Sequence, residues 1–89
     1  MTTRRSNAAF MPAPYTRADI NAVKGCIAGT ADSDQQKRAM KWIIETVCAT
    51  YDLSYRPESD RDTAFAEGRR FVGLQLVKAL KLDLSKIED

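Results

Sequence analysis

Carboxylates close together in the sequence are the first side chains that suggest catalysis. Glu58, Asp60 and Asp62 are near neighbours, and paired carboxylates can act as general acid and general base. The same residues surround Ser59, a good N-cap, in a segment whose pattern predicts the start of a helix. Acidic residues are favoured there because they interact with the positive end of the helix dipole. We therefore interpret the cluster as a helix start and predict no catalytic residue and no enzymatic activity.

The two cysteines do not complete a metal site or a nucleophilic centre. The chain has Cys26 and Cys48 but no histidine, so a zinc site would lack ligands and a thiol nucleophile would lack a base. Both cysteines lie in apolar stretches, which favours buried free thiols of a reducing compartment over a disulfide. The sequence predicts no metal and no cofactor.

A third polar group, Glu67-Gly68-Arg69-Arg70, lies inside a segment with helical periodicity. Three interpretations compete: ion pairs within or between helices, contact with an acidic surface of a partner protein, and binding of nucleic-acid phosphates. Adjacent residues on a helix point in different directions, which weakens the phosphate interpretation. We favour ion pairing and keep both arginines as candidate partner-binding residues.

The whole chain has the composition of one small soluble domain. Its 89 residues are 44% hydrophobic and 29% charged, which suits one domain and argues against wholesale disorder. The net charge is only +2, whereas affinity for DNA needs a concentrated basic surface. No apolar run approaches the roughly 20 residues of a membrane span. A chain this short is marginally stable alone, so association with a partner is expected.

Two helix starts precede the acidic cluster. Thr16 and Asp19 form the first cap, and Gly29 supplies the stop of a short helix. A capping box over residues 33–36, Ser-Asp-Gln-Gln, begins a longer helix. The apolar stripe of this second helix comprises Met40, Ile43, Ile44, Val47, Cys48 and Tyr51. Trp42 falls at its edge, where we interpret it as the margin of the core, with a contact anchor as the alternative.

The third helix is expected from the Ser59 cap to about Leu82, after a proline-containing connection over residues 52–59. One face would carry Phe65, Val72, Leu76 and Leu80, widened by Phe71, Leu74 and Val77. Such a face is too broad for a two-helix hairpin, so the first helix or another subunit must cover it. Each glycine inside the helix costs about 1 kcal/mol if it faces solvent. We therefore expect Gly68 to mark a close helix crossing, with Gly73 as a second candidate.

These elements predict an all-α fold, a small bundle of about three helices with an extended N-terminal arm. One helix is short, and the two long helices are expected to pair antiparallel. The helical domain should span residues 16–82, between an arm over residues 1–15 and a C-terminal tail over residues 83–89.

The arm is a candidate for binding a neighbouring chain. Pro12 and Pro14 lack backbone donors and hold the chain extended. Phe10 and Tyr15 add large side chains that could anchor it on a partner. The alternative interpretation is a terminus that frays.

The third helix resembles the signature of the Bbp19-like family of small tailed-bacteriophage proteins. That signature is an aromatic-x-Glu-Gly-Arg-Arg-x-Val-Gly-Leu stretch, and the matching residues are Phe65, Glu67, Gly68, Arg69, Arg70, Val72, Gly73 and Leu74. The resemblance covers about residues 18–82 and is specific only in the last third of the chain. It implies an all-helical fold and a phage origin, implies no enzyme activity, and assigns no role to any single residue.

We therefore expect a non-enzymatic phage protein that acts through protein-protein contacts, as a small virion component of the head, portal or internal ejection apparatus. Its partners would be other phage structural proteins or copies of itself, and it would reside in the virion after synthesis in the host bacterial cytoplasm. The candidate partner-binding residues are Phe10, Tyr15, Trp42, Gly68, Arg69, Arg70, Phe71, Gly73 and Leu74. A phage-encoded modulator of a host protein and a small nucleic-acid-binding protein are the alternatives.

Overall fold

The first helix has the ends that its sequence predicts. The structure is a computed structural model and describes residues 11–88. Helix α1 (Arg17–Ala28) begins at Thr16, whose hydroxyl accepts a hydrogen bond from the Asp19 N–H at 3.2 Å. The Asp19 carboxylate accepts one from the Thr16 N–H in return, at 3.1 Å. The helix ends at Gly29, whose φ of 77° lies in the left-handed region that favours glycine.

The second helix has its cap one residue before the predicted one. Helix α2 (Ser33–Trp42) is capped by Asp32, whose carboxylate accepts from the Gln35 N–H at 2.8 Å. The Gln35 side-chain oxygen accepts from the Asp32 N–H at 3.0 Å and completes the capping box. The predicted box over Ser33 and Gln36 is therefore wrong by one residue. A charged carboxylate is a stronger acceptor than a serine hydroxyl, which explains the choice.

The second helix also ends sooner than its apolar stripe predicts. It continues only as a π-helical turn, η2 (Ile43–Val47), in which the Cys48 N–H donates to the Ile43 carbonyl at 2.9 Å. Ala49 then takes a positive φ of 50°, and the chain leaves the helix. Tyr51, which was expected on the stripe, lies beyond this turn and is 68% exposed.

The third helix is the longest element. Helix α3 (Asp60–Lys81) begins at Ser59, whose hydroxyl accepts from the Asp62 N–H at 3.1 Å. It ends at Leu82, close to the predicted end. The tail then forms a short 3-10 turn, η3 (Leu84–Lys86), capped by the Asp83 carboxylate.

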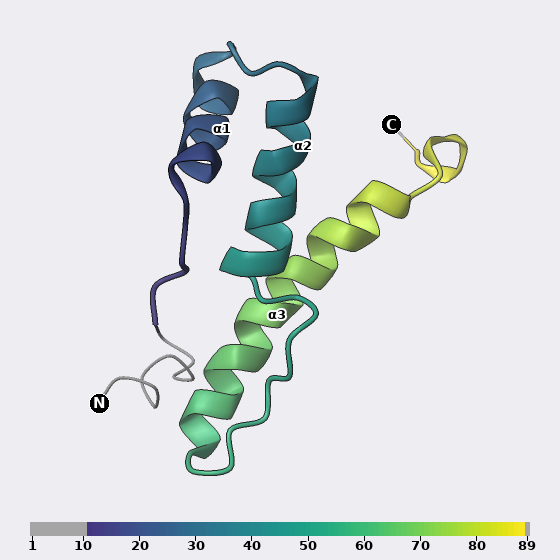
Figure 1. Cartoon of the computed structure of the whole chain (residues 1–89). Helices are drawn as coiled ribbons and strands as arrows, with labels where there is room; N and C mark the ends of the chain where they lie inside the picture. The colour runs from purple at the N-terminus through teal and green to yellow at the C-terminus, as the bar shows by residue number, and fades with distance from the viewer. Residues whose placement is uncertain (1–10, 89) are drawn as a thin grey trace.

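Helices α1 and α2 lie side by side and antiparallel, and α3 crosses the far end of this hairpin (Figure 1). The fold of residues 11–88 is thus all-α with three α-helices and no strand, as predicted. The antiparallel pair is α1 with α2, and not the two long helices. Helix α3 contacts the hairpin only through η2 and then diverges from α2.

The core is small and made almost entirely of small side chains. The buried residues are Ala22, Ala39, Ile44, Cys48, Ala49, Thr50, Ala66 and Gly73. The chain measures 44 × 35 × 16 Å, and its radius of gyration is 15.6 Å, against about 12 Å for a compact domain of this length. The result is a flat molecule in which short side chains let backbones approach closely while most long apolar side chains stay outside.

Candidate protein-interaction site

The crossing of α3 over η2 is built at Gly73. A Cβ atom at this position would lie 1.7 Å from Thr50 Oγ1 and 2.9 Å from Cys48 Cβ. Thr50 is itself fixed, because its side chain is buried and its hydroxyl donates to the Ile44 carbonyl at 2.6 Å. Only a glycine lets the two backbones come this close. The close crossing therefore lies at Gly73 and not at Gly68, which is exposed and where an added Cβ would meet nothing within 4 Å.

This crossing decides which face of α3 points inward. Ala66 and Gly73 are buried on the inner face, and Val77 is half-buried beside them. The predicted apolar face is not the buried one, since Phe65 is 51% exposed and Val72 53% exposed, and the first helix does not cover it. A close backbone approach tolerates only small residues, so the large side chains are turned to the flanks.

The flanks of α3 form the candidate surface. The large apolar side chains on this helix, which are 39% to 67% exposed, are Phe65, Phe71, Val72, Leu74 and Leu80. Phe71 and Leu74 are three residues apart and share one side of the helix. We call Phe65, Phe71, Val72 and Leu74 the α3 flank residues.

The Glu-Gly-Arg-Arg segment is partly engaged within the chain. The Glu67 carboxylate accepts a hydrogen bond from the Ser54 hydroxyl and lies 3.8 Å from Arg70 Nη1. The ion-pair interpretation therefore applies to Arg70, although an exposed pair of this kind adds little stability. Arg69 Nε is buried without a hydrogen-bond partner in the described part of the chain.

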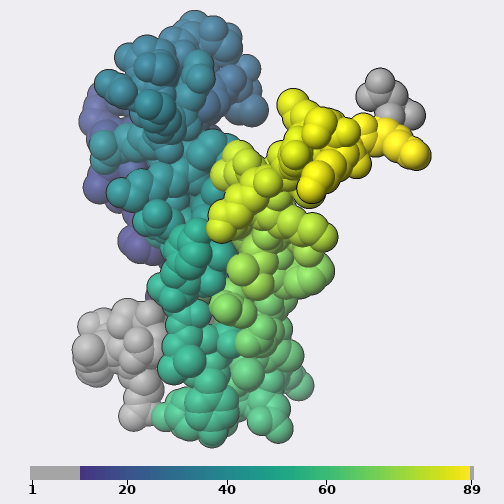
Figure 2. Space-filling view, turned by 90° about the vertical axis from the view of Figure 1, so that its right-hand side faces the viewer, coloured from purple at the N-terminus to yellow at the C-terminus, as the bar shows by residue number. Residues whose placement is uncertain are grey.

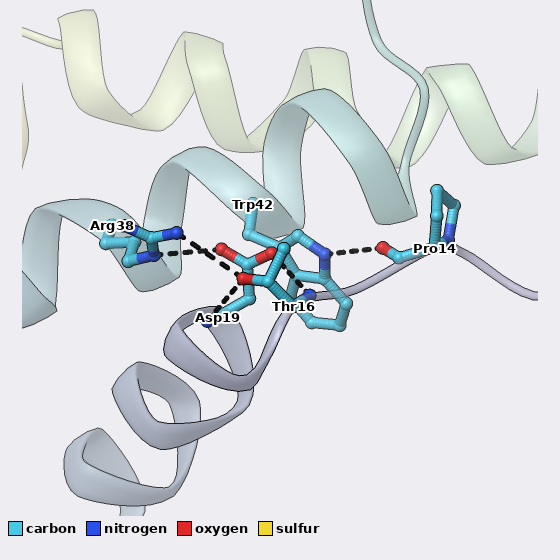
Figure 3. A network of polar contacts seen from close by, with 5 residues as sticks. All are labelled: Pro14, Thr16, Asp19, Arg38 and Trp42. Atoms are coloured by element: carbon cyan, nitrogen blue, oxygen red, sulfur yellow. Dashed lines mark hydrogen bonds and ion pairs between the residues drawn. The ribbon is translucent and has the colours of Figure 1, made fainter.

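A second group of predicted residues lies on the hairpin, away from α3. The Trp42 indole N–H donates to the Pro14 carbonyl at 2.9 Å, and Arg38 Nε donates to Asp19 Oδ1 at 3.0 Å (Figure 3). Trp42 is half-buried and holds the segment before α1 against α2. Its hydrogen bond matches the core-margin interpretation, while Tyr15 next to Pro14 is 68% exposed.

Asp19 carries the electrostatics of this network. The hydrogen bond from the Thr16 backbone N–H is the main reason that the pKa of Asp19 lies below 3.8. Partial desolvation opposes this shift, and the Thr16 hydroxyl and the Arg38 guanidinium add to it. The carboxylate is therefore ionised at neutral pH and joins the start of α1 to the middle of α2. The polar groups of this network are paired with one another and hold the hairpin together.

The residues considered for catalysis and metal binding do not converge. Asp60 and Asp62 lie in the first turn of α3 beside the Ser59 cap. Cys26 is exposed and Cys48 is buried, and both are free thiols, so the expectation of burial holds only for Cys48. Across residues 11–88, no group of three or more histidine, cysteine, aspartate or glutamate side chains could hold a metal ion.

Sequence reasoning missed a groove between α2 and the last turns of α3. It has a volume of about 550 Å³ and lies where the teal surface of α2 meets the yellow-green end of α3 in Figure 2. Apolar side chains form its floor, namely Met40, Ile44, Tyr51, Val77 and Leu80. Its rim is charged and includes Lys37, Lys41, Glu45 and Lys81. Only one sign of it is present in the sequence, the spacing of four residues between Lys37 and Lys41 on α2. The groove itself could not be predicted, because the crossing at Gly73 determines where it lies.

The structure separates the predicted site residues into two groups. Phe10 lies outside the described residues. Tyr15 and Trp42 belong to the hairpin, and the remaining six lie on α3. Among those six, Gly73 is buried, both arginines are half-buried, and Gly68, Phe71 and Leu74 are exposed.

Comparison with known proteins adds no relative. No protein-family model matches the chain, and no curated protein or solved structure matches it. The likeness of the third helix to the phage family stays a prediction. Of the helices within residues 11–88, none combines the length and apolar character needed to cross a membrane.

Proposed function

We propose that this chain is a non-enzymatic phage protein that works by binding other protein chains, as a small structural component associated with the virion. One observation carries the proposal: the α3 flank residues leave large apolar side chains 39% to 59% exposed along one helix. Several large apolar side chains exposed on one helix of a small protein are typical of a contact with another macromolecule.

The small core supports the same proposal. Ile44 is the single large aliphatic side chain among the buried residues of the described chain. A partner that covers α3 would add apolar burial that the chain does not provide for itself, and binding to the folded state would stabilise it by mass action. We expect the chain to gain stability on binding.

The phage and virion parts of the proposal rest on the resemblance of residues 65–74 to the family signature. In that segment, Gly73 is needed for the crossing, and Phe71 and Leu74 are displayed beside it. The signature thus contains both a folding determinant and exposed contact residues, as expected of a protein-binding helix.

Mass spectrometry of purified virions from the phage that encodes the chain tests this proposal. We expect the chain in the particle at a fixed stoichiometry. Replacing Phe71 with serine should reduce its incorporation without unfolding it, because this side chain is 59% exposed. The matched control is Ile27→Ser, on α1 and 88% exposed, which should incorporate normally. Absence of the wild-type chain from the virion would overturn the virion role.

A further inference from the structure

The groove between α2 and α3 has an apolar floor that nothing in residues 11–88 covers. Met40 is 37% exposed, and Tyr51 and Leu80 are 68% and 67% exposed. A volume of about 550 Å³ falls within the range of sites that enclose a ligand of a few hundred daltons. The space therefore suits two or three side chains of a short segment and not a whole helix.

The rim of the groove selects the charge of its occupant. Lys37 and Lys41 lie on α2 and Lys81 lies on α3, against a single acidic residue, Glu45. The rim thus carries a net charge of +2, three positive less one negative. None of the three lysines forms an ion pair with another described residue. The occupant should be apolar and acidic.

The C-terminal segment of this same chain has that composition. Leu84 is 82% exposed, and Leu82 and Ile87 are 51% and 47% exposed. Residues 82–88 contain two acidic residues, Asp83 and Glu88, and one lysine, a net charge of −1. The segment matches the groove in both apolar character and charge.

The tail is already shaped to present its apolar side chains. The Asp83 carboxylate accepts hydrogen bonds from the Ser85 N–H at 3.0 Å and from the Ser85 hydroxyl at 2.8 Å. The Ile87 N–H donates to the Leu84 carbonyl at 3.2 Å. In a 3-10 turn, residues three apart are eclipsed, so Leu84 and Ile87 share one side. An ordered turn loses less conformational freedom on binding.

The tail does not reach its own groove. Lys81 lines the groove, and the next residue, Leu82, is extended with ψ of 141°. The chain therefore leaves α3 in a direction away from α2 (Figure 1). Occupation in cis would require the chain to reverse its direction after Lys81. The N-terminal residues 1–10 have the wrong charge, with two arginines and no acidic residue.

From these observations we infer that the groove binds the C-terminal segment, residues 82–88, of a second copy of this chain. Each copy has one groove and one tail, so two copies that exchange tails around a two-fold axis form a closed dimer with two identical contacts. The inference rests on the proposed function, because it names one partner of a protein-binding chain. It uses a surface separate from the α3 flank residues.

Light scattering coupled to size-exclusion chromatography tests the inference on the full chain, over roughly 1 to 100 µM. We expect a dimer. Leu84→Ser should raise its dissociation constant about tenfold or more, because it removes an apolar side chain that the dimer would bury. Lys41→Glu should weaken the dimer by a similar factor, and added salt should weaken it further. Ile27→Ser and Lys24→Glu make the same chemical changes on α1 and should shift the constant by less than about twofold.

Mixing two variants tests the exchange directly. A chain with Lys37→Glu and Lys41→Glu keeps its tail, and a chain with Leu84→Ser and Ile87→Ser keeps its groove. Each should be monomeric alone, and the mixture should form a heterodimer through the one intact contact. Circular dichroism should show unchanged helix content, since all four positions are exposed.

Three results would overturn the inference: a wild-type chain that stays monomeric throughout, a dimer indifferent to both Leu84→Ser and Lys41→Glu, or variants that fail to combine. A monomer would mean that the tail folds back in cis or that the groove takes another protein. None of these results affects the proposed function, which the content of the virion decides separately.

Discussion

The α1–α2 hairpin and helix α3 are held in place by different kinds of contact. The hairpin is joined by directional polar contacts, including Arg38 with Asp19 at 3.0 Å and Trp42 with Pro14 at 2.9 Å. Helix α3 is joined to it by one close crossing, where Gly73 lies against Thr50.

This difference explains why α3 keeps more large apolar side chains exposed than the hairpin does. The hairpin contacts are spread over several residues, so each one contributes a modest part of the stability. The crossing places α3 by steric fit at a single point, and the rest of that helix keeps its large apolar side chains exposed. A helix docked in this way is well suited to bind a partner, because most of its large apolar side chains stay exposed.

The largest loss of stability is expected from a substitution at Gly73, where α3 crosses η2. Gly73→Ala places a methyl group 1.7 Å from Thr50 Oγ1, so the crossing must open, and we expect a loss of about 2 kcal/mol in the free energy of unfolding. Gly68→Ala is the matched control: with open space around it, it should gain about 0.5–1 kcal/mol from helix propensity. Urea denaturation measures both. Equal effects from the two substitutions would remove the distinction between the glycines.

The next effect concerns the residue under the crossing. Thr50→Val keeps the side-chain shape and removes the buried hydrogen bond to the Ile44 carbonyl, so we expect a loss of about 1–2 kcal/mol. Thr46→Val makes the same chemical change at a half-buried position on η2, away from Gly73, and should be nearly neutral. Chemical denaturation compares them. A neutral Thr50→Val would show that shape alone, without the hydroxyl, supports α3.

On the hairpin, a single polar contact should matter less. Trp42→Phe removes the indole N–H that donates to Pro14 and retains an aromatic ring, so a loss of about 1 kcal/mol is expected. The effect should be local, with faster amide exchange at Tyr15 and Thr16 and little change in α3. Hydrogen exchange followed by NMR measures it. Exchange rates that rise equally in α3 would show that the two regions are not independent.

The smallest effect on stability should be present near neutral pH and disappear in acid. Because the pKa of Asp19 is lowered in the folded chain, its contribution to stability is present above about pH 4 and is lost as the pH falls through the folded pKa. The melting temperature of the wild type should therefore exceed that of Asp19→Asn near neutral pH, and the gap should close in acid. Asp83→Asn is the comparison in the tail: the pKa of Asp83 is also lowered, so it should show a gap of the same sign, but a smaller one, because its hydrogen bonds lie within the tail's own turn. A gap that persists in acid would exclude the carboxylate charge as its cause.

The sequence by itself determined where the three helices begin, to within one residue, and where α1 and α3 end, but not where α2 ends. Thr16, Gly29 and Ser59 act through contacts with residues only a few positions away, so local pattern is enough to predict them. The error of one residue at Asp32 arose because two adjacent polar residues can each form the same box. The resemblance likewise came from the order of residues along one stretch of the chain.

Only the tertiary structure decided which face of α3 is buried, where the crossing lies and that a groove opens beside it. Apolar periodicity favoured the face with Phe65 and Val72, but close approach to Thr50 selected the face with Ala66 and Gly73. The steric fit between residues more than twenty positions apart in sequence outweighed the larger apolar area. Such a fit depends on the shape of both surfaces at once, and no single stretch of sequence contains both.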